Sequence, residues 1–378
     1  MPGKHLSSEN PKERRELAPL IAVALILLGL TLGSFLAPDQ AFSANENRYL
    51  QQAPKLTWQT LMAGTFSTEA EKYLSDQMLL RESWMEGKSL LQRATGKKDI
   101  GGVYLGAEGY YFARLTEDDF DRSRFEKNVG FVSRFFAANE NKSCRILLVP
   151  TPDTVLSDKL PKNAVTFDRA ACDTLLADTF GERAVLPYAA LVKAAETEQV
   201  YYRTDHHWTS QGAETAYRQW AASMGYTPRQ FTLTEVSDSF RGTMYSKVLL
   251  PDSAYDSIYL DRSVTIRSMD CDGTEYPSLY VDAALQQKDQ YEVFLGGNYA
   301  KAVIDTGADT GKSLLLIKDS FANCFIPFLA GEYDTITVLD LRFFRGSVQE
   351  LADASDDILV LYEMTNFAGD ANLFKLQK

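Results

Sequence analysis

The chain has 378 residues, of which 45% are hydrophobic and 24% charged, and 39 Lys and Arg against 51 Asp and Glu give a formal net charge of -12. This composition is typical of a folded protein and excludes disordered and collagen-like chains. The acidic balance and the lack of a Lys/Arg cluster in the sequence argue against nucleic acid as the main partner.

One segment departs from the average of a soluble globular protein. No residue from Ala18 to Ala37 carries a charge, and the run has about the ~20 residues needed to cross a bilayer. Lysines and arginines concentrate before it, in residues 4–15, which predicts a cytoplasmic N-terminus and an external chain after Pro38. We therefore expect a cytoplasmic tail (residues 1–17) and a single-span signal anchor (residues 18–37) in the cell membrane.

The alternative for this segment is a cleaved signal peptide. Such peptides usually have an apolar region of ~7–15 residues followed by an A-x-A-like cleavage site. The apolar run here is longer, and Phe42-Ser43-Ala44 is only a weak cleavage site. The sequence therefore favours the uncleaved anchor.

The cysteines all follow the apolar run, so this topology places them outside the cell, where disulfides form. Their spacing matches no zinc-site pattern, and four cysteines allow three pairings, which stay open. For Cys144, which precedes the expected strand 146–149, a buried small apolar side chain is at least as good an interpretation. The four residues are Cys144, Cys172, Cys271 and Cys324.

A helical pattern follows the polar stretch after the anchor. Thr68 and Glu71 match a capping box, in which each side chain satisfies a free backbone donor of the first helical turn. Apolar residues then recur at helical spacing until Gly96. We interpret residues 38–100 as a helical stalk, and we expect a hairpin over residues 103–112.

From there to the C-terminus, helices alternate with short apolar runs bounded by turns. This order predicts a mostly parallel sheet covered on both faces, within one domain of residues 101–378. A helix capped by Ser123 and Glu126 is expected before the first run. The expected strands are residues 146–149, 293–295, 313–317, 335–339 and 358–362.

Histidine is scarce, and only His206 and His207 follow the apolar run. If this stretch is extended, residues two apart share a face, so Asp205 and His207 can meet while His206 faces away. A carboxylate bonded to an imidazole fixes its tautomer and stabilises the imidazolium, as a general base requires. A metal ligand pair and two structural histidines are the alternative interpretations.

Ser320 is a candidate nucleophile. It follows the expected strand 313–317 and precedes an apolar, helical stretch that begins at Phe321. A serine at such a turn carries its hydroxyl at the carboxyl edge of the sheet, where the helix N-terminus favours developing negative charge. Asp319 and Ser320 are also ordinary helix caps, and capping is the simpler interpretation of either residue alone.

A glycine-rich turn follows the expected strand 293–295. Gly296-Gly297-Asn298 allows a close backbone approach and ends in a side-chain amide donor, which are the parts of an oxyanion hole. The same sequence also occurs in turns that have no function.

Three short motifs together resemble the DHHW protein family: Asp-His-His-Trp at 205–208, Phe-Leu-Gly-Gly-Asn at 294–298 and Lys-Asp-Ser-Phe-Ala at 318–322. The likeness also covers Glu46-Asn47-Arg48, Asp76-Gln77, Arg81 and Asp340-Leu341-Arg342. That family resembles the SGNH-hydrolase-like proteins related to the external alginate O-acetyltransferases of bacteria. The resemblance implies an α/β, SGNH-hydrolase-like three-layer sandwich with a mostly parallel sheet and circularly permuted motif order, behind a transmembrane helix and stalk.

The resemblance also implies site residues, without a metal or an organic cofactor. Lys318 replaces the glycine of a GDS-like block, the spacing is Asp-x-His and not Asp-x-x-His, and the acid and base precede the serine. The implied roles are Ser320 as nucleophile, His207 as base, Asp205 as orienting acid, and Gly297, Asn298 and Ser320 as the oxyanion hole.

Together with the expected anchor, the resemblance implies a membrane-anchored external enzyme that moves acetyl groups on or off a cell-surface polysaccharide through an acetyl-Ser320 intermediate. Acetyl-CoA is absent outside the cell, and for a transferase the resemblance implies a multi-pass membrane O-acyltransferase as the acetyl donor. Transferase and esterase share one triad, and the sequence does not separate them. The competing interpretation is a non-catalytic surface module that binds a glycan or an envelope protein.

Four further residues are candidates for substrate contact. Tyr202 and Trp208 offer aromatic faces to a sugar ring. Arg203 and Arg342 either bind substrate carboxylates or pair with Asp residues of the fold, and the structural role is the simpler interpretation of each.

Overall fold

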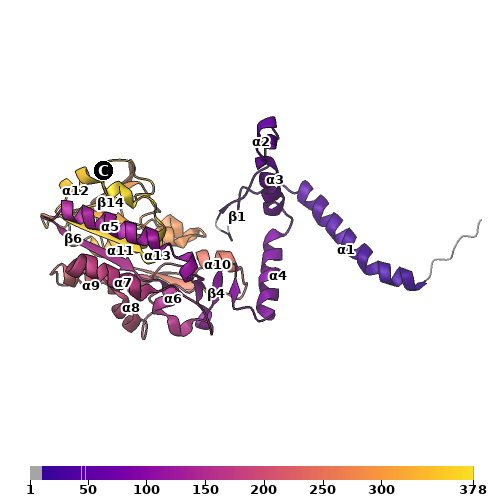
Figure 1. Cartoon of the computed structure of the whole chain (residues 1–378), viewed down its shortest axis with the longest axis horizontal. Coiled ribbons are helices and arrows are strands. Elements are labelled where there is room, and N and C mark those ends of the chain that lie inside the picture. The colour runs from indigo at the N-terminus through magenta and orange to yellow at the C-terminus, as the bar shows by residue number, and fades with distance from the viewer. Residues whose placement is uncertain (1–10, 44, 47, 378) are drawn as a thin grey trace, which may run out of the picture. The chain divides into compact units, whose positions relative to one another are not determined.

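The computed structural model describes residues 11–43, 45–46 and 48–377, and it divides after Leu91 into two compact units (Figure 1). The N-terminal unit begins with α1 (Pro11–Leu36). Residues 17–36 of this helix have a mean hydropathy of 2.3, and none of that stretch is buried. By length and composition this helix can cross a membrane, whereas the first ten residues of the expected tail lie outside the described residues.

Two helices stand where the sequence pattern predicts one continuous helix ending at Gly96. The backbone breaks between them at Leu80, whose φ is +59°. The first of the two begins directly after Gly64, so Thr68 lies inside the helix, and the predicted capping box of Thr68 and Glu71 is wrong. The elements after α1 are β1 (Phe42–Ser43), β2 (Arg48–Tyr49), α2 (Trp58–Met62), α3 (Thr65–Asp76) and α4 (Arg81–Ala94).

Four residues that carry the family resemblance form an ion-pair cluster in the N-terminal unit. The Arg48 guanidinium lies 2.6 Å from Asp76 Oδ1 and 3.0 Å from Glu46 Oε2. Arg81 pairs with Glu46 and lies 3.8 Å from Asp76 Oδ1. The cluster fastens the loop that holds Glu46 and Arg48 to α3 and α4, so these residues have a structural role within their own unit.

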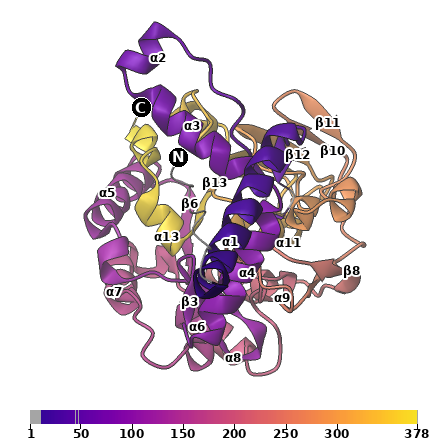
Figure 2. The ribbon, with the colours of Figure 1, turned by 90° about the vertical axis from the view of Figure 1, so that its right-hand side faces the viewer.

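The C-terminal unit is built on a mixed sheet, which among residues 92–377 has eight strands in the order β11-β10-β12-β14-β13-β15-β6-β7. The last five strands of this order run parallel, and the first three pair antiparallel. Figure 2 shows the antiparallel strands on the right and the helices α5 (Arg122–Ala138) and α7 (Arg169–Phe180) on the left. The strands are β6 (Ser143–Val149), β7 (Ala184–Val185), β10 (Ser268–Cys271), β11 (Thr274–Tyr276), β12 (Lys301–Asp305), β13 (Ser313–Lys318), β14 (Thr335–Leu339) and β15 (Asp357–Glu363).

Alternate residues of the central strands enter two separate cores. On β6, Leu147 and Val149 join one apolar cluster, while Ile146 and Leu148 join the other, because side chains alternate between the faces of a strand. The first cluster packs against α8 (Tyr188–Ala194), α9 (Ser210–Ser223) and α11 (Phe321–Leu329), and the second against α5, α7, α12 (Val348–Asp353) and α13 (Met364–Gly369). The sheet therefore has helices on both faces, which confirms the expected α/β three-layer sandwich.

Smaller elements complete this unit. The hairpin expected over residues 103–112 is confirmed as β4 pairing with β5. The cysteines are buried free thiols. The remaining elements are β3 (Asp99–Ile100), β4 (Val103–Leu105), β5 (Tyr111–Ala113), β8 (Thr234–Phe240), β9 (Asp256–Leu260), α6 (Pro152–Val155), α10 (Thr243–Val248) and short 3-10 turns.

Two local predictions are wrong. The cap of α5 is Asp121, whose side chain accepts a hydrogen bond from the Arg124 N–H, and not Ser123. Residues 293–295 are not a strand, because a 3-10 turn (Gln290–Val293) ends there and Leu295 and Gly296 both have positive φ. The expected strands 146–149, 313–317, 335–339 and 358–362 are confirmed as β6, β13, β14 and β15.

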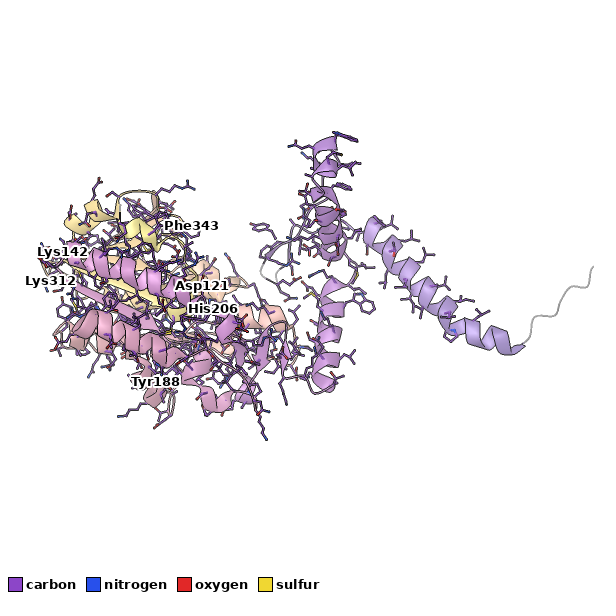
Figure 3. The ribbon with its side chains drawn as sticks, in the orientation of Figure 1. Asp121, Lys142, Tyr188, His206, Lys312 and Phe343 are labelled. Atoms are coloured by element: carbon purple, nitrogen blue, oxygen red, sulfur yellow. The ribbon has the colours of Figure 1, made fainter. Side chains whose placement is uncertain are left out.

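The parallel strands direct their carboxyl ends to one edge of the sheet. Figure 3 shows His206 at one end of this unit and Lys142 and Lys312, which precede β6 and β13, at the other end. Ser320 follows the end of β13, and Glu363 is the last residue of β15. Ligands of open α/β sheets bind outside the carboxyl ends of the strands. A functional site is therefore expected at this edge.

Candidate active site

The Asp-His-His-Trp segment forms a bent loop at this edge. Tyr201 and Trp208 pair across its base as an isolated antiparallel bridge. The fully buried Trp208 indole donates a hydrogen bond to the carbonyl of Phe321, 2.9 Å away, and so ties the loop to the first turn of α11. Thr209 then caps α9 by accepting from the Gly212 N–H.

Three side chains from two segments meet in a continuous hydrogen-bonded line. The Nδ1 of His207 lies 2.6 Å from Asp205 Oδ1, and its Nε2 lies 2.8 Å from Ser320 Oγ. The Asp205 carboxylate is buried and also accepts from the His207 backbone N–H at 2.9 Å. A carboxylate, an imidazole and a serine hydroxyl in this order have the connectivity of a Ser-His-Asp triad.

The contacts of Ser320 differ from those of a helix cap. Ser320 occupies the cap position of α11, yet its side chain makes no capping hydrogen bond. The neighbouring Asp319 accepts from the Phe321 N–H at 2.9 Å instead. Capping therefore accounts for Asp319 but not for Ser320, whose hydroxyl is free to bond to His207.

The second oxygen of Asp205 is held by α10. Oδ2 accepts from the N–H of Thr243 at 2.8 Å and from its hydroxyl at 3.0 Å. Gly242 brings the backbone this close, because a Cβ there would stand 2.2 Å from Asp205 Oδ2. His206 does not face away from His207 as expected: the two ring centroids are 3.8 Å apart, and His206 Nδ1 lies 2.7 Å from the Thr243 hydroxyl.

Tyr291 is a contact that the sequence patterns do not indicate. Its ring stacks on His207 with a centroid separation of 3.8 Å and an interplanar angle of 8°. Its hydroxyl donates to the carbonyl of Ser320 at 3.1 Å. Tyr291 comes from the 3-10 turn at residues 290–293, and it holds the imidazole plane and the serine backbone in one geometry.

Burial and charge set the protonation states of this cluster. Burial lowers the pKa of His207 to about 4, the nearby His206 cation acts in the same direction, and Asp205 opposes both. Burial alone would raise the pKa of Asp205, but the neighbouring His206 charge and the hydrogen bonds from the two histidines hold it well below its usual range. Burial would lower the pKa of His206, but the Asp205 charge outweighs it and raises that pKa. At neutral pH, His207 is therefore a neutral imidazole beside an ionised Asp205.

Asp205, His206 and His207 also form a possible cation-binding group, because ligand atoms of all three lie within 4.8 Å of one another. A metal needs a free ligand atom on each histidine. Both ring nitrogens of His207 already have hydrogen-bond partners in Asp205 and Ser320. A metal bound here would have to break one of those bonds, so the geometry fits the hydrogen-bonded line better than a metal centre.

Lys318 organises the second part of the site. Only 1% of this residue is exposed, and burial lowers the pKa of its ammonium to about 8, against the pull of Asp340 and Asp319. Its Nζ donates to Asn298 Oδ1 at 2.8 Å and to Asn323 Oδ1 at 2.6 Å. Since an ammonium has no acceptor, both amides must point their oxygens at it.

This orientation has a chemical consequence for Asn298. With its oxygen turned to Lys318, the NH₂ group of the exposed Asn298 faces away from the ammonium and can act as a donor. The Asn323 NH₂ group donates to the carbonyl of Gly297 at 3.2 Å, which fastens the glycine turn to α11. Gly297 and Asn298 therefore lie in one hydrogen-bonded cluster with Lys318, and Lys318 precedes Ser320 by two residues.

The four candidates for substrate contact are buried in the fold or pack against it. Tyr202 and Trp208 are no more than 1% exposed, so neither presents a ring face to a ligand, which corrects that expectation. The Arg342 guanidinium pairs with the buried Asp340 at 2.6 Å, in the structural role that was the simpler interpretation. Arg203 is partly exposed, and its guanidinium lies over the ring of Tyr110.

Comparison with known proteins gives the family and the fold of this chain. The model of the family described as DHHW protein matches residues 147–339. Among solved structures, a DHHW family protein from Eubacterium siraeum is 20% identical, with a TM-score of 0.63 over 74% of this chain and 96% of that one. Bacillus cereus PatB1 with a sulfonyl adduct is 21% identical, with a TM-score of 0.60 over 73% and 98%. No curated protein matches, and at these identities the structural likeness establishes the fold.

Proposed function

The chain belongs to the DHHW protein family, and we propose that it is a membrane-anchored enzyme that transfers acetyl groups on or off a cell-surface polysaccharide. The observation that carries the proposal is the line from Asp205 through His207 to Ser320, with contacts of 2.6 and 2.8 Å. Serine is a weak nucleophile unless a base takes its proton, and the neutral His207 is in hydrogen-bond reach to do so.

In the first half of the proposed reaction, Ser320 Oγ attacks the acetyl carbonyl carbon while His207 Nε2 takes the hydroxyl proton. Asp205 stabilises the imidazolium, and His207 returns the proton to the leaving oxygen as the original ester bond breaks. In the second half, a hydroxyl oxygen attacks the acetyl-Ser320 carbonyl, its proton passes to His207, and Ser320 Oγ leaves and regains a proton. A sugar hydroxyl in this step gives a transferase, and water gives an esterase.

We assign Asn298, Gly297 and the Ser320 N–H to the stabilisation of the oxyanion. Preorganised donors aimed at the developing charge are often the largest single contribution to catalysis. Lys318 is proposed as a positioning residue, because its ammonium turns the Asn298 amide so that the NH₂ group faces away from it. This proposal gives a function to Lys318, which stands where a GDS-like block has a glycine.

The N-terminal part of the proposal concerns location. We propose that α1 anchors the protein, that residues 38–100 are a stalk and that residues 101–378 form the catalytic domain outside the cytoplasm. The support is the length and hydropathy of residues 17–36. A multi-pass membrane O-acyltransferase is proposed as the acetyl donor, because an external transferase has no acetyl-CoA.

The direct test is hydrolysis of a chromogenic acetate by the full chain in detergent, with mass spectrometry of the peptide that holds Ser320. We expect turnover and a transient acetyl group on Ser320, both lost in Ser320→Ala and in His207→Ala. Ser239→Ala is the matched control, since Ser239 is an exposed serine. Equal turnover in all four proteins would reject the proposal in favour of a non-catalytic module that binds a glycan or an envelope protein.

A further inference from the structure

A pocket of about 380 Å³ borders the proposed triad. It opens at the carboxyl ends of β15 and β6, and its lining includes His206 and Phe321, the residues next in sequence to His207 and Ser320. Its apolar wall includes Tyr111, Met244 and Phe321. A pocket of this size with mostly apolar walls and a few polar groups is typical of small-ligand sites.

Two buried acids in the lining have oxygen atoms without partners. Asp153 is 2% exposed and Glu363 is 4% exposed. Within the described residues, Asp153 Oδ2 and Glu363 Oε1 are buried and make no hydrogen bond. The other oxygen of Glu363 accepts from Thr365 and from the Asn366 N–H, which caps α13. Because a buried carboxylate oxygen without a donor is costly, these two atoms indicate a ligand that supplies donors.

The charges around the pocket define the ligand further. Burial raises the pKa of Asp153 to about 6 and that of Glu363 to about 7. The cationic groups of the lining are His206, which compensates Asp205, and the solvent-exposed Lys247. At neutral pH Asp153 is mostly ionised and Glu363 is partly ionised, so a ligand carboxylate would add negative charge beside desolvated acids, which is unfavourable.

We propose that this pocket is the acceptor subsite, and that it binds a sugar unit with hydroxyl or amino donors and no carboxylate. The inference rests on the proposed function, because it places the acceptor hydroxyl beside Ser320. Ring hydroxyls or an ammonium donate to Asp153 Oδ2 and Glu363 Oε1, while the apolar face of the ring contacts the Tyr111 and Phe321 side of the pocket. The acceptor is thus a neutral or amino sugar and not a uronic acid.

The test measures binding of three tetrasaccharides to the full chain in detergent by titration calorimetry: N-acetylglucosamine, glucosamine and galacturonic acid oligomers. We expect the N-acetylglucosamine or the glucosamine oligomer to bind more tightly than the galacturonic acid oligomer, by roughly tenfold or more. One charge-assisted hydrogen bond to a pocket acid contributes about 1.4 kcal/mol, which corresponds to a tenfold change in the dissociation constant. Tightest binding of the glucosamine oligomer would identify an ammonium ligand, and equal binding of the first two would identify hydroxyl donors.

The variants are Asp153→Asn with Glu363→Gln, which keep the shape of both side chains. We expect them to weaken glucosamine binding by roughly tenfold and to remove the discrimination against galacturonate. Asp178→Asn with Glu182→Gln are the matched controls, because both of these acids are exposed. Thermal unfolding of each variant shows whether it is folded.

Failure of the subsite and failure of the proposed function give different results. Ser320-dependent acetate hydrolysis without saturable binding of any oligomer, or with galacturonate bound most tightly, overturns the subsite alone. Unchanged binding in the folded double variant also overturns it. Sugar binding that depends on both acids, in a protein without Ser320-dependent hydrolysis, overturns the proposed enzyme and with it the acceptor role.

Discussion

The two units of this chain depart from ordinary globular surfaces in opposite ways. The N-terminal unit leaves large apolar side chains in the open, along the whole of residues 17–36 and at Trp58 and Leu91. The C-terminal unit instead gathers buried charged groups at one edge of its sheet, with Lys318 and Asp205 each no more than 2% exposed. Exposed apolar surface indicates an apolar partner, and buried charge indicates a site. The comparison therefore supports the proposed division of roles, in which one unit contacts the membrane and the other carries the chemistry.

Among the changes that test this comparison, the largest loss of activity is expected from a mutation of Ser320. Ser320→Ala removes the proposed nucleophile, and we expect acetate turnover to fall by about 10³-fold or more. The mutation leaves the exposed apolar helix untouched, so the protein should stay in the membrane fraction. Turnover within tenfold of the wild type would show that the buried charges at the sheet edge serve another purpose.

Gly242→Ala tests the support of Asp205 without changing a triad residue. The added Cβ would stand 2.2 Å from Asp205 Oδ2 and must displace the carboxylate. Because small displacements of catalytic groups cost about 10²-fold, we expect that loss in the turnover rate. Gly87→Ala is the matched control, since Gly87 lies in α4 and a Cβ added there would meet no atom within 4 Å. A Gly242→Ala protein with normal turnover would argue that Asp205 is not held by this contact.

The pH profile tests the buried ammonium of Lys318. His207 is neutral above its pKa of about 4, so turnover should rise through that pH, and the Lys318 ammonium is lost above about 8, so turnover should fall there. Lys318→Met should lower turnover by about 10²-fold, as loss of an oxyanion donor does. It should also remove the fall above about pH 8. A variant that keeps that fall would show that another group causes it.

The smallest effect on activity is expected from the N-terminal unit. Leu25→Arg with Leu28→Arg places two charges on the exposed apolar helix, at a cost of roughly 5–7 kcal/mol for membrane insertion. We expect the protein to leave the membrane fraction while acetate turnover per folded molecule stays within about twofold. Gly29→Ala is the neutral control in the same helix. Membrane retention of the double variant would break the division of roles between the units.

The sequence predicts those features that depend on residues close together in the chain. The strands at 146–149 and 313–317 are confirmed, because long apolar runs bounded by turns have few alternatives. Short runs are ambiguous, and residues 293–295 belong to a turn because positive φ at Leu295 and Gly296 redirects the chain. No glycine or proline marks the break between α3 and α4 at Leu80, so the sequence does not predict it.

The sequence predicts which residues form the candidate site but not the contacts that hold them in place. The motifs select Asp205, His207 and Ser320, yet the expected extended strand is a bent loop in which His206 packs against His207. The sequence shows Lys318 only as a replacement of the glycine of a GDS-like block, because its contacts with Asn298 and Asn323 form only when the glycine turn and α11 come together. The support depends on tertiary contacts that no spacing pattern records.

The most direct test of the central claim is the reaction of the full chain in detergent with phenylmethylsulfonyl fluoride, followed by mass spectrometry of the Ser320 peptide. In this reaction Ser320 Oγ bonds to sulfur and fluoride leaves, provided that His207 takes the proton. The account predicts an adduct on Ser320 in the wild type and none in a folded His207→Ala variant. An adduct that forms equally in both proteins, or a folded wild type without an adduct at Ser320, would contradict it.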